Sequence, residues 1–154
     1  MNSASVEATT TLTLASWGRR AAALLLDGII LSAVVLATIL VAGVPLEDIN
    51  TTIREGDTLT VILLFVVPEA VYDVFFIGSR GQTPGKQALR IKVVDAADQR
   101  IPIGYRRAFS RWLFTALLWA LFTVPGVIDH LWPLRDKRRQ TLHDKFARNV
   151  VVRS

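Results

Sequence analysis

Apolar residues in this chain are gathered into three long blocks instead of being spread at helical or strand spacing. The first block ends near residue 43 and the second near residue 78, and each is long enough to cross a hydrocarbon core of about 30 Å as a helix. No small-residue cleavage site follows the first block, so it does not resemble a signal peptide. The pattern predicts an all-α integral membrane protein with two transmembrane helices, over about residues 19–43 and 58–78.

The third apolar block, residues 109–134, is interrupted by Pro125 and Gly126. Proline removes a backbone donor, and the pair favours a bend. We therefore expect this segment to enter the membrane and return as a re-entrant hairpin. The alternative is a single third span, with Trp112 and Trp132 about 30 Å apart at the two interfaces.

Two short runs outside the apolar blocks, "LRIKVV" and "RNVVVR", are rich in β-branched residues. The first belongs to residues 79–108 and the second to the basic tail, residues 135–153. We expect the two runs to pair as a short cytoplasmic two-stranded β element. Pairing requires both runs to lie on the same side of the membrane.

The stretch "GQTPGK", from Gly81 to Lys86, connects the second block to the first strand. Thr83 to Lys86 fits a type II turn, with Pro84 at its second position and Gly85 at its third. The spacing excludes a nucleotide-binding loop, because only three residues separate the glycines and no serine or threonine follows the lysine. Lys86, Arg90 and Lys92 are expected to lie at anionic lipid headgroups. The alternative is that these charges serve only to set the topology.

Charge is distributed unevenly along the chain, which has 18 Lys and Arg against 13 Asp and Glu. Residues 44–57 hold four acidic residues and one arginine, whereas residues 80–111 and the tail hold more Lys and Arg than Asp and Glu. Because Lys and Arg stay on the cytoplasmic side of short loops, we expect a multi-pass protein of the inner (plasma) membrane with a cytoplasmic N-terminus. Residues 1–15, rich in Ser, Thr and Ala, are expected to be a disordered tail before a membrane domain over residues 16–153.

Ionisable residues inside the apolar blocks are the functional candidates, because a charge at lipid depth is costly. Arg20 and Asp27 are seven residues apart. This spacing places them about 20° apart around a helix, on one face. Such a pair suits proton or ion binding, or serves helix packing alone.

The second block carries Glu69 and Asp73, which lie one above the other at i and i+4. Two carboxylates this close in a low dielectric do not both ionise cheaply, so they would share a proton or a cation. Pro68 also leaves the carbonyl of Leu64 without its helical donor, as a further oxygen ligand. The alternative is that this carboxylate pair lies near the interface and is solvated by water.

Asp129 in the third block and Asp144 in the tail complete the candidate proton and ion ligands. His130 beside Asp129 suits a proton relay, but a single histidine near a tryptophan is more typical of the membrane interface. Thr141 with Asp144 is a weak capping signal. The chain has no cysteine, and it has neither a serine–base motif nor an HExxH motif. We therefore expect no enzymatic activity, no metal site and no cofactor.

Three segments, "GRRAAALLLDGII", "GQTPGKQALRIKVVD" and "RRQTLHDKFARNVVV", together resemble the RDD family of small bacterial membrane proteins, named for one arginine and two aspartates. The resemblance covers about residues 16–153 and implies that Arg20, Asp27 and Asp144 are the naming residues. The chain departs from the family pattern at residues 147–149, where Ala-Arg-Asn replaces the common Ala-Gly-Thr.

Some RDD members are described as sodium/proton antiporters, so the resemblance implies a proton-coupled transporter of H⁺ and a monovalent cation. Three apolar segments are too few to enclose an ion path across the membrane. We therefore expect a homo-oligomer. The alternative function is a non-transporting membrane adaptor or assembly protein that binds anionic lipid or a partner protein through its basic cytoplasmic surface. No nucleic-acid partner is expected.

Overall fold

The computed structural model describes residues 13–41, 45, 48, 51, 58–121 and 123–154. Most of the predicted acidic loop and residues 1–12 of the predicted tail lie outside this part of the chain.

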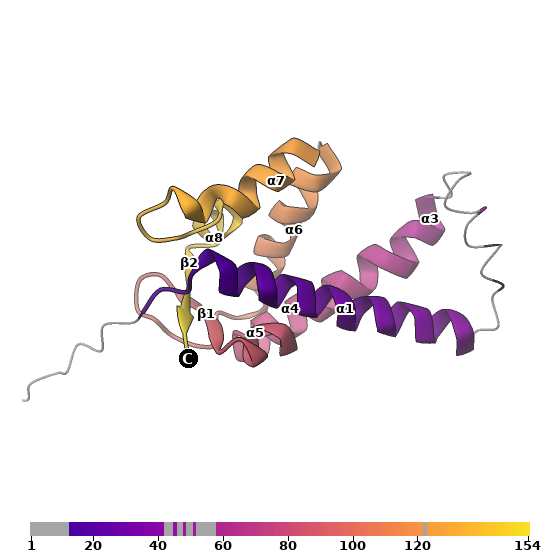
Figure 1. Cartoon of the computed structure of the whole chain (residues 1–154), viewed down its shortest axis with the longest axis horizontal. Helices are drawn as coiled ribbons and strands as arrows, with labels where there is room; N and C mark the ends of the chain where they lie inside the picture. Colours follow the sequence, from indigo (N-terminus) through magenta and orange to yellow (C-terminus); the bar gives the residue numbers. More distant parts are fainter. Residues whose placement is uncertain (1–12, 42–44, 46–47, 49–50, 52–57, 122) are drawn as a thin grey trace, which may run out of the picture.

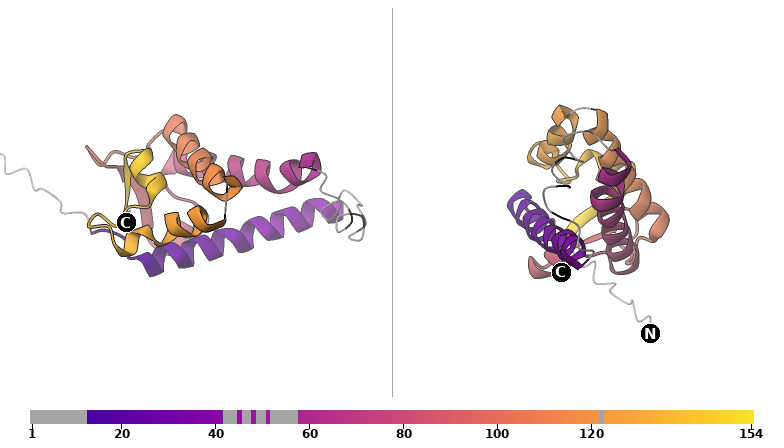
Figure 2. Two further views of the ribbon diagram at one scale, coloured as in Figure 1. Left: turned by 90° about the horizontal axis from the view of Figure 1, so that it is seen from above. Right: turned by 90° about the vertical axis from the view of Figure 1, so that its right-hand side faces the viewer.

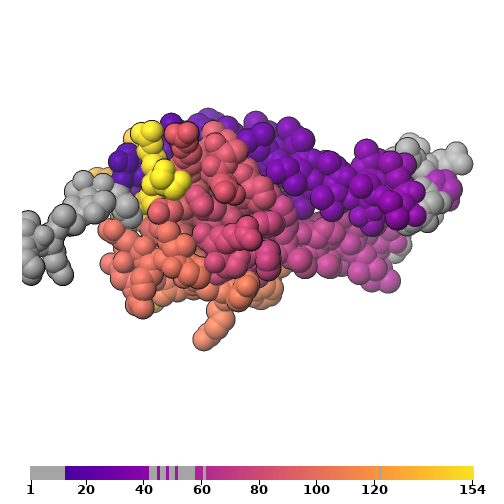
Figure 3. Space-filling model, turned by 90° about the horizontal axis from the view of Figure 1, so that it is seen from below, coloured from indigo at the N-terminus to yellow at the C-terminus, as the bar shows by residue number. Residues whose placement is uncertain are grey.

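The prediction that the first two apolar blocks form long helices is confirmed. Helix α1 covers Trp17–Val41, and α3 (Thr58–Val61), the π-helical η1 (Ile62–Val66) and α4 (Val67–Arg80) form one continuous helix. These helices have 25 and 23 residues, enough to cross a membrane, and only 11% and 12% of their apolar windows are buried. Both extend away from the end of the molecule that holds the C-terminus, and they form the narrow end of the space-filling view (Figures 1 and 3).

The type II turn predicted from Thr83 to Lys86 is wrong. This stretch begins a short helix, α5 (Pro84–Ala88), in which the Thr83 side chain accepts a hydrogen bond from the backbone N–H of Lys86. A threonine at the N-cap and a proline at the first helical position both favour a helix start. The left-handed conformation occurs earlier, at Gly81, which has φ 68° and ends α4.

A two-stranded antiparallel sheet joins β1 (Ile91–Asp95) to β2 (Asn149–Arg153), as predicted. Residues 13–15, which the sequence assigns to the tail, lie along the other edge of β2: Leu14 bridges Val152, and Ala15 N–H donates to the carbonyl of Val151 at 3.0 Å. The start of α1, the segment after α4 and the C-terminus therefore meet in one place (Figure 1).

The third apolar block forms two helices, α6 (Tyr105–Leu121) and α7 (Thr123–Leu131), and α7 runs back along α6 (Figure 2). The break lies before Pro125, not at the Pro-Gly pair as predicted. Pro125 sits in the first turn of α7, where its missing N–H leaves no helical hydrogen bond unmade. Gly126 instead permits close packing, because a Cβ at this position would lie 2.5 Å from the ring of Trp119.

The remaining elements, η2 (Trp132–Leu134) and α8 (Leu142–Phe146), return the chain to the sheet. The apolar core lies around this sheet and includes Ile77, Ile91 and Val151. The buried residues of α1 are few and include a charged one, Asp27. The packed core therefore lies at the end of the molecule that holds the sheet, while most apolar side chains of the two long helices are not buried.

Candidate functional site

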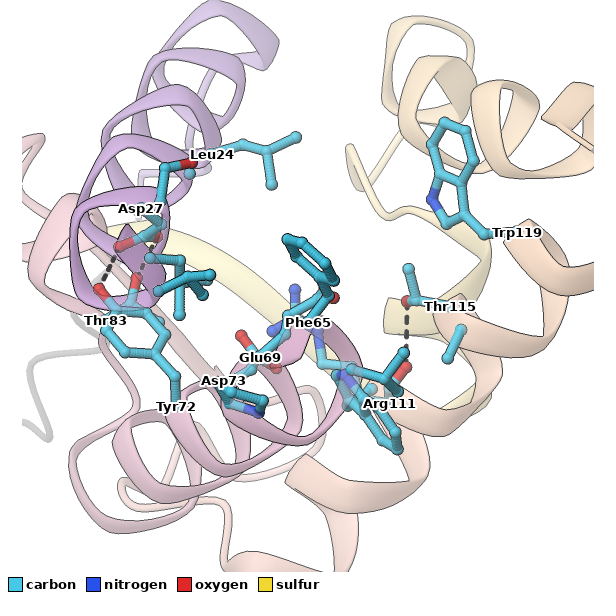
Figure 4. Close-up of a pocket in the computed structure, with 18 of the residues that line it drawn as sticks. Leu24, Asp27, Phe65, Glu69, Tyr72, Asp73, Thr83, Arg111, Thr115 and Trp119 are labelled. Carbon is cyan, nitrogen blue, oxygen red and sulfur yellow. Dashed lines mark hydrogen bonds between the residues drawn. The ribbon is translucent and has the colours of Figure 1, made fainter. Parts of the chain in front are cut away.

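A cavity of about 880 Å³ lies between α1, the helix formed by η1 and α4, and α6 with α7 (Figure 4). Apolar side chains such as Leu31, Val35 and Ile39 line it along α1. The π-helical segment and Pro68 also face it, through Phe65, Val66 and the proline ring. The polar residues of the lining are Asp27, Ser32, Glu69, Tyr72, Asp73, Thr83, Lys86, Arg111, Thr115, His130 and His143.

Asp27 is buried, with 6% of its surface exposed, and it is held from two neighbouring elements. Thr83 Oγ1 donates to Asp27 Oδ2 at 2.5 Å, and Gly85 N–H donates to Oδ1 at 2.8 Å, both from the start of α5. The Tyr72 hydroxyl of α4 donates to Oδ1 at 2.8 Å. Lys86 Nζ lies 3.7 Å from Oδ2. The carboxylate therefore has the hydrogen bonds and the nearby cation that a buried charge requires.

Glu69 and Asp73 of α4 face the same cavity, as their spacing predicts (Figure 4). Lys86 Nζ lies 4.0 Å from Asp73 Oδ1, so one ammonium is shared between Asp73 and Asp27. Glu69 is more exposed than Asp73. Burial lowers the pKa of Lys86, and the charges of Asp73 and Asp27 partly oppose this shift.

Arg20 does not pair with Asp27, although the two were expected on one face. Its Nη1 lies 2.6 Å from Oδ2 of Asp144. Arg111 Nε of α6 lies 3.3 Å from the other oxygen of Asp144, which is fully buried. Two guanidinium groups thus share one carboxylate, and the cluster ties α1, α6 and α8 together. Burial alone would raise the pKa of Asp144, but the charges of Arg20 and Arg111 outweigh it and hold the pKa far below its usual range.

Asp144 is positioned by a capping box at the start of α8. Thr141 Oγ1 accepts from the backbone N–H of Asp144 at 3.1 Å, and Asp144 Oδ2 accepts from the backbone N–H of Thr141 at 3.2 Å. The weak capping signal in the sequence is therefore confirmed. The same carboxylate serves as helix cap and as arginine partner.

Asp129 belongs to a second buried chain of contacts, through His143 and Arg111. Asp129 Oδ2 lies 2.5 Å from His143 Nδ1, and Asp129 Oδ1 accepts from the His143 backbone N–H at 3.0 Å. Arg111 Nη2 lies 2.9 Å from His143 Nε2. A guanidinium only donates, so Nε2 accepts and Nδ1 carries the proton. His143 is therefore neutral, and burial together with the Arg111 charge lowers its pKa.

Comparison with known protein families gives one match. The family model described as RDD family matches residues 14–148, which is most of the chain. This chain belongs to the RDD family. Comparison with curated proteins and with solved structures found no match. The segment matched as RDD contains Arg20, Asp27 and Asp144, which fall into two separate clusters in the structure.

Two further site residues of this RDD protein, Arg111 and His143, were not identified from the sequence. Arg111 was counted only as a basic residue that sets topology, and His143 was not singled out. Thr83 was expected in a turn and is instead a donor to Asp27. The sequence does carry a signal for Arg111, because it lies near the start of the apolar block of residues 109–134. A charged residue in such a block needs a buried partner. Among the described residues of the RDD chain, no group of three or more His, Asp or Glu is arranged to hold a metal ion.

Proposed function

We propose that this RDD-family membrane protein exchanges protons for a monovalent cation such as Na⁺ in the inner (plasma) membrane. The observation that carries the proposal is the convergence of Asp27, Glu69 and Asp73 on one cavity with a single ammonium, that of Lys86. The proposal involves no covalent chemistry.

The charge balance of the Asp27, Asp73 and Lys86 group supports exchange. Two carboxylates share one ammonium, and Glu69 lines the same cavity. In a low dielectric the excess negative charge is stabilised by a proton or by a cation, and the two compete for the same position. Asp27 is fixed by its hydrogen bonds, so Glu69 and Asp73 are the residues that take up and release the ion.

The proposed topology has two spans, α1 and the helix of residues 58–80, with α6 and α7 re-entering from the cytoplasmic side. The supporting observation is the sheet, because β1 follows the second span and β2 ends the chain. Two strands that pair lie on one side of the membrane, and basic residues gather at this end, which favours the cytoplasm. The cytoplasmic position of the N-terminus follows, since residues 13–15 join the same sheet.

A homo-oligomer would complete the wall of the path. The outer faces of the spans carry exposed apolar side chains, such as Leu25 at 70% and Leu59 at 65%. In a bilayer such faces contact lipid or a second copy. One chain contributes few helices around the cavity, so we propose that the path is closed by neighbouring copies.

The proposal is tested by flux in liposomes that hold the purified protein and an imposed pH gradient. Addition of Na⁺ or K⁺ is expected to cause proton movement that is lost in Glu69→Gln and in Asp73→Asn, because these two residues are proposed to take up and release the ion. Asp98→Asn, whose carboxylate pairs with Arg100 outside the spans, is the matched control and should leave the flux unchanged. Folding of each variant is checked by thermal unfolding in detergent.

Equal proton leak with and without the protein would reject transport and favour the adaptor function. In that case the carboxylates and Lys86 would serve helix assembly alone. Flux that survives in both carboxylate variants would instead show that the ion follows another path.

A further inference from the structure

A second pocket, of about 300 Å³, lies between the first turns of α1 and helix α7. Its charged lining residues are Arg20, Lys86 and Arg111, and among the described residues that line it there is no carboxylate. The pocket on the α1–α7 side is therefore cationic, whereas the α4 side of the larger cavity carries Glu69 and Asp73.

The arginines of this pocket have hydrogen-bonding capacity to spare. Asp144 is the ion-pair partner of Arg20 Nη1 and of Arg111 Nε. Within the described part of the chain, Nε and Nη2 of Arg20 and Nε and Nη1 of Arg111 are buried donors without a hydrogen-bond acceptor, and Asp144 Oδ1 is a buried acceptor without a hydrogen-bond donor. The next carboxylate, Asp129, is separated from Arg111 by the neutral His143 ring. Guanidinium donors in this state bind a phosphate group well, because they meet two of its oxygens at once.

The rest of the pocket lining is mostly apolar, although His130, Thr141 and His143 also belong to it. Leu24, Val127 and Leu131 line it and are each exposed. Leu24 and Trp119 also line the larger cavity, where they lie on opposite sides (Figure 4). An occupant with an anionic head and hydrocarbon chains could thus place its head at the arginines and its chains along this apolar opening.

We propose that the pocket binds the phosphate of an anionic phospholipid, held by Arg20 and Arg111 and entered between α1 and α7. Basic pockets between membrane helices on the cytoplasmic side are suited to lipid headgroups. The site differs from the proposed exchange site in Arg20, Val127 and Leu131, which do not line the larger cavity, whereas Arg111 and Lys86 line both.

The test uses the full chain, delipidated in detergent, with dioleoylphosphatidylglycerol as the probe. Native mass spectrometry counts bound lipid, and thermal unfolding measures stabilisation. One saturable lipid per chain is expected, with a higher Tm. Dioleoylglycerol, which has the chains without the phosphate, and inorganic phosphate, which has no chains, are each expected to bind at least about tenfold more weakly.

Two variants locate the site. Val127→Trp fills the pocket, and Ile128→Trp is its matched control, since Ile128 is equally exposed (43% against 42%) and is not among the lining residues. Arg20→Lys keeps a positive charge beside Asp144 and removes the spare guanidinium donors. We expect Val127→Trp and Arg20→Lys to weaken lipid binding about tenfold while Ile128→Trp stays within about twofold of the parent.

Lipid binding that is the same in Val127→Trp and Ile128→Trp would overturn the assignment, and so would equal binding of dioleoylglycerol. If inorganic phosphate binds as tightly as the lipid, the pocket is an anion site and the lipid proposal fails.

Discussion

A Cβ atom on Gly85 would lie 2.7 Å from Oδ1 of Asp27 and 2.5 Å from the carbonyl oxygen of Ala23. Both distances are shorter than van der Waals contact, and one involves the backbone of α1. The N–H of Gly85 donates to the same Asp27 oxygen. Helix α5 therefore reaches α1 this closely only because residue 85 has no side chain.

Gly85→Ala is expected to destabilise the protein by about 1–3 kcal/mol, because α5 must move away from α1 and loosen its hydrogen bonds to Asp27. Gly28→Ala on α1 is the control, since a Cβ there has nothing within 4 Å. That control should be as stable as the parent or slightly more stable, because alanine favours a helix over glycine. The measurement is thermal unfolding in detergent; equal Tm values for the two variants would contradict the close approach.

Arg148 has φ 54°, in the left-handed region, at the turn between α8 and β2. The resemblance to the RDD family implies glycine at this position. A side chain with a Cβ costs about 1–2 kcal/mol in this conformation. Arg148→Gly is therefore expected to leave stability unchanged or to raise it by up to about 1 kcal/mol, because glycine relieves the strain but loosens the unfolded chain. Arg153→Gly, in the extended strand β2, should lower the Tm instead; a drop of equal size in both variants would argue against strain at Arg148.

Asp144→Asn removes the negative charge that Arg20 and Arg111 share as ion-pair partner in the described part of the chain. Breaking a buried ion pair on one side costs about 3–5 kcal/mol, because the remaining charge is left uncompensated. We expect a large loss of Tm, measured beside Asp98→Asn, whose exposed pair with Arg100 should contribute nothing measurable. A small loss in Asp144→Asn would mean that the two arginines find other partners.

His143 gives the stability a defined pH dependence. Burial and the Arg111 charge lower the pKa of His143 in the folded protein, so the unfolded chain takes up the proton first as the pH falls. The contribution of the neutral ring is complete above the ordinary histidine value near 6.5 and is lost below it, by at most about 1.4 kcal/mol per pH unit. Unfolding measured from pH 7.5 to 5.5 should show this slope. The His143→Gln variant should be less stable at pH 7.5, and its free energy of unfolding should depend less on pH. An unchanged slope in this variant would assign the pH dependence to another group.

Ser154→Cys reports the side of the C-terminus without interference, because the chain has no native cysteine. Ser154 N–H donates to the carbonyl of Arg90, next to β1. With re-entrant α6 and α7, a membrane-impermeant maleimide should label Ser154→Cys only after the membrane is opened. Asp48→Cys, between the two spans, should be labelled on intact cells. Labelling of Ser154→Cys from outside would favour a third span.

Much of the fold follows from local patterns that one segment carries by itself. The length of an apolar run decides whether it makes a long helix, and the β-branched runs make strands wherever they find a partner. The apolar blocks and the two strands were therefore predictable, and the RDD resemblance was carried by contiguous motifs. The capping box of Thr141 and Asp144 was also local, since its residues are three apart.

The partners of the charged residues were decided only by the tertiary structure. Helical periodicity placed Arg20 and Asp27 on one face, but it compares residues of one helix and cannot weigh a partner from another. Arg20 donates a hydrogen bond to Asp144, which is 124 residues away, and Asp27 accepts hydrogen bonds from Thr83 and Gly85 at the start of α5. A buried charge pairs with the donor or counter-ion that the packing of separate helices brings within about 3 Å. No single segment of the sequence determines that distance, so no local pattern predicts the partner.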